Sequence, residues 1–153
     1  MCAMGVFFDY FAAASDEEAA AVIDRAGGPA GDEEPRYATV AAQGFEPFVK
    51  MGRLTSLLTG RTYDEIADEY GDPVAIRDEG ERLVARMPDA VTNALADASD
   101  ERLAEVAGPW SRTEEFAWDN VGPADLTPVL HRLGALARDA RAKGQRLYCW
   151  VCV

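Results

Sequence analysis

The stretch LTPVLHRLGALARDARAKGQRLYCWVCV, residues 126–153, decides the fold of this chain. From Leu126 to Ala140 apolar residues recur every three or four positions, which predicts an amphipathic helix. Gly144 suits the left-handed position that commonly ends a helix. The run from Leu147 to Val153 shows no polar alternation, which is typical of a strand covered on both faces. The sequence therefore predicts a helix followed directly by a buried strand.

The other end of the chain also begins with a strand pattern. Val6 to Phe11 is rich in aromatic residues and is interrupted by Asp9, which predicts a strand with one polar position. Ser15 and Glu18 have the spacing of a capping box, so a short helix is expected from Asp16 to Ala26. We expect the two terminal strands to be neighbours in one small sheet.

The middle of the chain predicts several short helices. Helices are expected at residues 46–59, 63–70, 88–98 and 100–107, and a short strand at 37–41. Arg82 to Met87 fits either a strand or the lead-in to a helix. Gly108-Pro109 is expected to break the preceding helix, which leaves Trp110 to Gly122 irregular. The predicted fold is α+β, a single domain over residues 1–153, with both terminal strands in a small sheet packed with short helices.

Composition excludes several classes of protein. The chain has 153 residues with 27 acidic and 15 basic side chains, a formal net charge of -12. Binding nucleic acid requires clustered Lys and Arg, so a nucleic-acid partner is not expected. No apolar run approaches the ~20 residues that span a bilayer, and no signal-peptide pattern opens the chain, so we expect a cytoplasmic protein without a membrane. The three cysteines are an odd number, which is atypical of a disulfide-stapled secreted domain.

A family resemblance emerges from packing and turn residues along most of the chain. It rests on the opening Met4-Gly5 with its aromatic strand and acidic helix, on Leu54 to Gly60, and on the closing helix, glycine and apolar strand. The order of Pro88 to Leu95, Ser99 to Leu103 and the Gly108-Pro109-Trp110 break is similar as well. Together these segments resemble the YfbM-like family of small uncharacterised bacterial proteins. The resemblance implies an α+β fold and supplies no catalytic residues.

Cys149 and Cys152 form a C-x-x-C motif, which in redox proteins lies where a strand enters a helix. Here the motif lies inside the closing strand. Residues three apart on a strand point to opposite faces and lie about 10 Å apart, too far for a disulfide between them. We therefore expect both to be buried structural cysteines, because free cysteine packs as a small apolar residue.

Metal and acid-base sites are weakly supported. Asp64, Glu65, Asp68 and Glu69 have a helical spacing that suits a hard cation, but the oxygen ligands from a second element are not apparent, so a solvated acidic face is expected. His131 is the only histidine, which excludes a multi-histidine zinc site and a two-histidine relay. We expect it to be a surface side chain. No metal and no cofactor are expected.

The most informative group of candidate site residues lies in the stretch without clear periodicity. Aromatic rings next to carboxylates can bind a cationic ligand or anchor a partner protein. The candidates are Trp110, Glu114, Phe116, Trp118 and Asp119. The competing interpretation is an irregular flap whose tryptophans pack over the sheet.

Two hypotheses of function follow. The first is a non-catalytic binding module, an adaptor or an immunity-like protein, whose acidic surface steers a partner protein with a basic surface toward an aromatic patch. It requires exposed aromatic side chains. The alternative is a small-molecule-binding protein or minor enzyme with a pocket near Trp110 to Asn120 that uses carboxylates as acid or base. It requires a carboxylate with a raised pKa.

Overall fold

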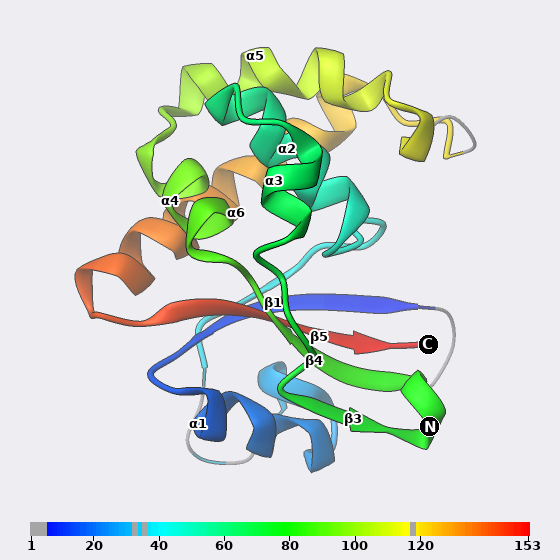
Figure 1. Ribbon diagram of the computed structural model, residues 1–153, viewed down its shortest axis with the longest axis vertical. Coiled ribbons are helices and arrows are strands. Elements are labelled where there is room, and N and C mark those ends of the chain that lie inside the picture. The colour runs from blue at the N-terminus through cyan, green and yellow to red at the C-terminus, as the bar shows by residue number, and fades with distance from the viewer. Residues whose placement is uncertain (1–5, 32–33, 35–36, 117–118) are drawn as a thin grey trace.

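The computed structural model describes residues 6–31, 34, 37–116 and 119–153 and is built on a five-stranded antiparallel sheet (Figure 1). The strand order is β2-β1-β5-β4-β3. The strands are β1 (Phe7–Ala13), β2 (Thr39–Ala41), β3 (Ala75–Arg77), β4 (Arg82–Arg86) and β5 (Arg146–Cys152). The α+β class and the pairing of the two terminal strands are thereby confirmed, since β1 and β5 pair along their full lengths.

The sheet lies between two layers of unequal size (Figure 1). The larger layer contains α2 (Val49–Thr59), α3 (Tyr63–Ala67), α4 (Asp89–Asp97), α5 (Asp100–Ser111) and α6 (Pro123–Ala142). The smaller layer contains α1 (Asp16–Ala20) and the 3-10 helices η1 (Ala21–Asp24) and η2 (Gly28–Ala30). Two further 3-10 turns are η3 (Asp78–Gly80) and η4 (Glu114–Phe116).

Strand β5 lacks polar alternation because both of its faces are covered. Leu147, Cys149 and Val151 belong to the core under the larger layer. Tyr148, Trp150 and Cys152 belong to the core under the smaller layer. The expectation that Cys149 and Cys152 point to opposite faces and are buried is confirmed. Cys149 is a free thiol as expected, whereas Cys152 is disulfide-bonded.

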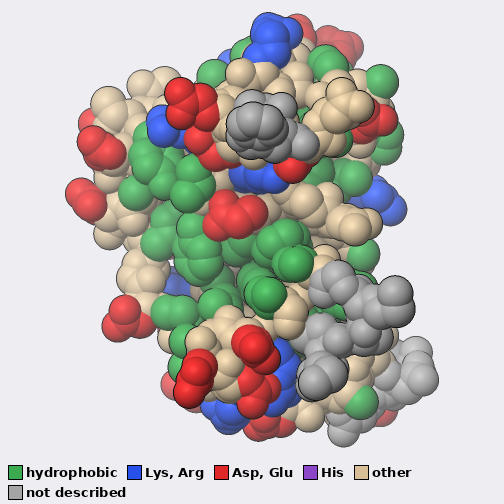
Figure 2. All heavy atoms as spheres, turned by 90° about the vertical axis from the view of Figure 1, so that its right-hand side faces the viewer, with side chains coloured by type: hydrophobic (Ala, Val, Ile, Leu, Met, Phe, Trp, Pro, Cys, Tyr) green, Lys and Arg blue, Asp and Glu red, His purple; other side chains and the backbone are tan. Residues whose placement is uncertain are grey.

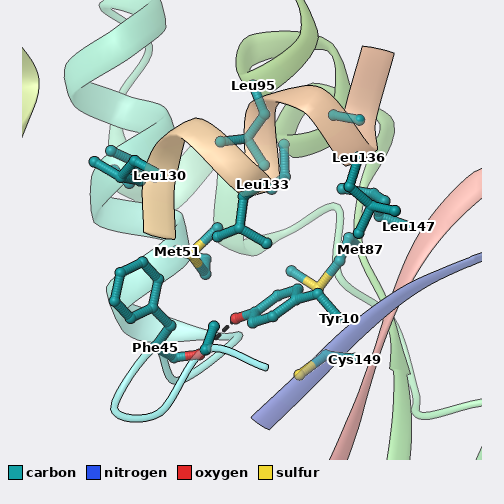
Figure 3. Close-up of a cluster of buried hydrophobic side chains, with 14 of the residues drawn as sticks. Tyr10, Phe45, Met51, Met87, Leu95, Leu130, Leu133, Leu136, Leu147 and Cys149 are labelled. Carbon is teal, nitrogen blue, oxygen red and sulfur yellow. Dashed lines mark hydrogen bonds between the residues drawn. The ribbon is translucent and has the colours of Figure 1, made fainter. Parts of the chain in front are cut away.

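Tyr10 connects β1 to the larger layer (Figure 3). Its ring rises from the strand between Met87 and Leu133, and its hydroxyl donates a 2.5 Å hydrogen bond to the carbonyl oxygen of Phe45. The residue is completely buried, so this bond satisfies a polar group that would otherwise lie unpaired in the core. The bond also fixes the segment that leads from β2 into α2.

The predicted break at Gly108-Pro109 is wrong, because α5 continues through both residues to Ser111. Proline removes one hydrogen bond from a helix, and here it lies near the C-terminal end. The next residue, Trp110, is fully buried, and its packing holds the last turn in place. Tertiary contacts therefore override the local preference.

Other boundaries also differ from the prediction. Helix α6 begins at Pro123, where the Asp125 carboxylate accepts a hydrogen bond from the Gly122 N–H. Helix α2 begins at Val49 because the Glu46 carboxylate accepts bonds from the first free N–H groups of this turn instead of lying inside the helix. The α1 helix and α3 are shorter than predicted, and β3 was not predicted at all.

Candidate functional site

Trp110 and Phe116 lie in the core. Trp110 is 0% exposed, and its ring packs edge-to-face on Phe45 at 5.1 Å and on Phe116 at 4.8 Å. Its indole N–H donates a 2.8 Å hydrogen bond to the carbonyl oxygen of Lys50. The two rings are therefore used for packing and present no aromatic surface to a partner.

The carboxylates that follow are attached to α2 by ion pairs. Lys50 Nζ lies 2.6 Å from Asp119 Oδ2 and 4.3 Å from the centre of the Phe116 ring. Arg53 Nε lies 3.2 Å from Glu115 Oε1. Lys50 thus brings Trp110, Phe116 and Asp119 together, whereas Glu114 is exposed on η4. The remaining candidate, Trp118, lies outside the described residues.

A different apolar surface lies at one end of the sheet. In the part of the chain that the structure describes, six large apolar residues are exposed, and four of them lie there, namely Val6, Phe7, Ile76 and Val153. They lie at the same end of the sheet because Phe7 pairs with Cys152, Cys152 pairs with Arg82, and Arg82 pairs with Arg77 next to Ile76. Phe7 is on the face of the smaller layer and Ile76 on that of the larger layer, so these exposed side chains surround the end of the sheet. With the partly buried Phe8 and Leu83 we call these six residues the apolar end. The face that includes this end of the sheet shows a band of hydrophobic side chains between acidic ones (Figure 2).

The apolar end continues the core outward along one row of the sheet. Phe8 and Leu83 both lie opposite Val151, and Ile76 lies opposite Leu83, so all four side chains are on the face of the larger layer. Val151 is buried, whereas Ile76 on the edge strand is 53% exposed. The row is therefore an extension of the core that the helices leave partly uncovered.

Acidic side chains border this surface at the turn between β3 and β4. Asp78, Glu79 and Glu81 are all exposed. Arg82 Nε neutralises Asp78 at 2.8 Å, whereas Glu79 and Glu81 form no ion pair with any residue the structure describes. Asp78 and Glu79 have φ angles of 53° and 58°, in the left-handed region that non-glycine residues rarely adopt. The turn thus holds negative charge that no described residue neutralises, on a strained backbone.

The opposite face of the same end contains a buried carboxylate. Asp9 lies opposite Trp150 across β1 and β5, so the two side chains share the face of the smaller layer. Asp9 is 8% exposed, and its side chain makes no hydrogen bond or ion pair with the described part of the chain. Burial raises the pKa of its carboxyl group above the usual value. The indole N–H of Trp150 is also buried without a partner among the described residues.

The Trp150 ring is held between two neighbours. Phe7 stacks on it with ring centres 6.5 Å apart and an interplanar angle of 29°. A Cβ added to Gly28 would lie 2.6 Å from the indole ring, so η2 can approach the ring only because this position has no side chain. Phe7 and Trp150 thus stack on each other, and Asp9 lies opposite Trp150 on the same face of the sheet.

In the sequence, Asp9 stands out only as an interruption of the first strand. A charged residue within an aromatic strand is visible in the sequence. It is the only sequence feature that points to the group of Phe7, Asp9 and Trp150. No comparable signal marked Ile76 and Leu83, whose exposure depends on which strand forms the edge of the sheet. Their place at the surface follows only from the folded arrangement.

The other expected sites are readily placed. His131 lies on the flank of α6, with Nε2 3.0 Å from the carbonyl oxygen of Asp100. Glu65 and Glu69 both pair with Arg61. Within the described ranges, no three His, Cys, Asp or Glu side chains are grouped in a way that could hold a metal ion. None of the described helices has the length and apolar character needed to cross a bilayer.

Comparison with known proteins yields no match to a family model, to a curated protein or to a solved structure. The resemblance to YfbM-like proteins therefore stays a prediction.

Proposed function

We propose that this protein is a non-catalytic binding module, with an adaptor or immunity-like role, that binds another protein through the apolar end of its sheet. The observation that supports this most is the concentration of exposed apolar side chains at one place on an otherwise highly charged chain. Exposed apolar groups bordered by polar residues are typical of protein interaction surfaces. The binding surface differs from the aromatic stretch that the sequence favoured.

The proposed partner has a basic surface. The net charge of -12 attracts cationic proteins over long range. Close to the apolar end, Glu79 and Glu81 are exposed and unpaired among the described residues, so they are available to basic side chains at the rim of an interface. The same charge opposes association of two copies of the chain through this surface. A basic polypeptide therefore fits the site better than a second copy does.

The test compares two substitutions of similar chemistry at different places. Ile76→Asp puts a charge into the apolar end, whereas Leu57→Asp changes an exposed leucine on α2, away from it. A partner is first identified by crosslinking and mass spectrometry in host lysate and then purified, and its affinity for each variant is measured by calorimetry.

We expect Ile76→Asp to weaken binding by about 2 kcal/mol, roughly thirtyfold, and Leu57→Asp to leave it unchanged. Raising the salt concentration from ~0.05 M to ~0.5 M should slow association, because charges at the rim are screened. Equal affinities for both variants, or a partner with an acidic surface, would overturn the proposal.

We further propose a cytoplasmic location and kinship with YfbM-like proteins, as the composition and the quoted segments suggest. Fractionation of host cells with an antibody against the protein tests the location, and recovery in a membrane or secreted fraction would contradict it.

The alternative function, binding or conversion of a small molecule, is favoured by one observation. A carboxyl group with a raised pKa is present, as that hypothesis requires, but it is Asp9 and not one of the carboxylates near Trp110. If this alternative is correct, a small bound mass appears in the native mass spectrum of protein isolated from its host and disappears from the Asp9→Asn variant.

A further inference from the structure

We propose that Phe7, Asp9 and Trp150 form a socket for one cationic side chain, lysine or arginine, supplied by the basic polypeptide. This inference rests on the proposed function and adds the chemistry of a specific contact to it.

Asp9 lacks a counter-charge within the described part of the chain. The residue is more than nine-tenths buried, and no described residue provides a hydrogen bond or a positive charge to its side chain. A buried carboxylate without a partner is costly, and proteins normally pair such groups. A cation from outside the chain would supply the missing charge. An anionic ligand would be repelled, and a neutral amide would leave the charge uncompensated.

Two aromatic residues are neighbours of Asp9 on the same face of the sheet. Phe7 is two residues before Asp9 on the same strand, so both side chains are on the face that also contains Trp150. Cations bind favourably against the faces of aromatic rings, and tryptophan is the strongest partner of this kind. The rings of Phe7 and Trp150 therefore suit the same group that Asp9 requires.

The entrance to the socket lies at the proposed interface, because Phe7 is 38% exposed and belongs to the apolar end. A partner that covers Phe7, Val6 and Val153 would bring its own side chains next to Asp9. A long flexible lysine or arginine side chain can reach a nearly buried carboxylate while its backbone stays outside.

The experiment uses two small probes of nearly equal shape. N-acetyl-lysinamide carries the ammonium group, and N-acetyl-norleucinamide lacks it. Each is titrated into the whole protein labelled with ¹⁵N, and the indole N–H resonance of Trp150, assigned by Trp150→Phe, reports binding. This N–H has no partner among the described residues, so its resonance is sensitive to a group that arrives beside it.

We expect a saturable shift with the lysine probe and at least about tenfold weaker binding of the norleucine probe, as expected for the loss of a charge pair. Asp9→Asn should weaken binding of the lysine probe by a similar factor. Phe7→Ala changes an exposed ring and is not expected to disturb folding. It should also weaken binding of the lysine probe. Equal binding of both probes, or equal binding by the wild type and Asp9→Asn, would overturn the socket.

The outcome is separable from that for the proposed function. Ile76→Asp should weaken partner binding while leaving the lysine probe unaffected, since Ile76 faces the opposite side of the sheet. If the lysine probe shows no preferential binding while the apolar end still binds the partner, only the socket is contradicted. Failure of Ile76→Asp to affect the partner would contradict the proposed function, while probe binding would still report on the socket.

Discussion

The indole N–H of Trp110 donates a hydrogen bond to the carbonyl oxygen of Lys50, and the ammonium group of the same Lys50 pairs with Asp119. One residue of α2 therefore holds both the end of α5 and the segment that follows it. This double contact explains why residues expected to contact a ligand are instead part of the fold.

Trp110→Ala should destabilise the protein by about 3–5 kcal/mol, because it removes a completely buried ring and leaves a cavity between Phe45 and Phe116. Urea unfolding measures the change. Trp110→Phe, which keeps most of the packing, should cost less. A stable Trp110→Ala variant that has lost only partner binding would instead favour an aromatic binding site at this position.

Thr92→Val should stabilise the protein by about 1 kcal/mol. The Thr92 hydroxyl is buried on α4 without a hydrogen-bond partner among the described residues, so the isosteric change removes an unsatisfied polar group. Thr55 is the matched control, because it is also buried in a helix but donates a 2.8 Å bond to the carbonyl oxygen of Met51. Thr55→Val should bring no such gain. If both variants shift the thermal midpoint alike, the difference in hydrogen bonding has no energetic effect.

Glu79→Gly should raise the free energy of unfolding by up to about 1 kcal/mol, since glycine adopts the positive φ of this turn without strain. Glu81 provides the comparison, because its φ of -66° is an ordinary helical value. Glu81→Gly should therefore lower stability through the added freedom of the unfolded chain. Chemical denaturation distinguishes the two, and destabilisation by both substitutions would show that Glu79 is not strained.

Asp9→Asn should stabilise the free protein at neutral pH, because it removes a buried charge that no residue of the described ranges pairs with. Burial raises the pKa of Asp9 in the folded state above its ordinary value of 3.8, so the folded state binds a proton more readily than the unfolded state does. Between these two pKa values the wild-type protein loses stability as the pH rises. The advantage of Asp9→Asn should accordingly shrink on acidification through this range and be smallest below the ordinary pKa of 3.8. Thermal midpoints recorded from acidic to neutral pH test this, and an advantage independent of pH would contradict it.

Much of the fold could be predicted because the decisive signals are local. The apolar run of β5 and the periodicity of α6 depend only on neighbouring residues, and the predicted Ser15 cap forms, because its side chain accepts a hydrogen bond from the Glu18 N–H. The end of α5 was mispredicted because the burial of Trp110 outweighs the effect of Pro109. The short edge strand β3 lacks a strong pattern and is defined by pairing with β4.

The candidate site was less predictable. An aromatic residue beside carboxylates looks the same in sequence whether its ring is buried, as in Trp110, or exposed, as in Phe7. Which of these occurs depends on contacts between distant segments. Asp9 was the exception, because an acidic residue inside an apolar strand is conspicuous in the sequence itself.

The position of β5 has a consequence for how the chain folds during synthesis. β5 lies between β1 and β4 and is made after both of them, so those two strands have no common neighbour until it emerges from the ribosome. The pairing of Phe7 with Cys152 joins segments at nearly opposite ends of the sequence, and contacts of such long range slow folding. The apolar faces of β1 and β4 therefore remain incompletely covered until β5 has been synthesised. During this interval we expect the nascent protein to be most prone to aggregation.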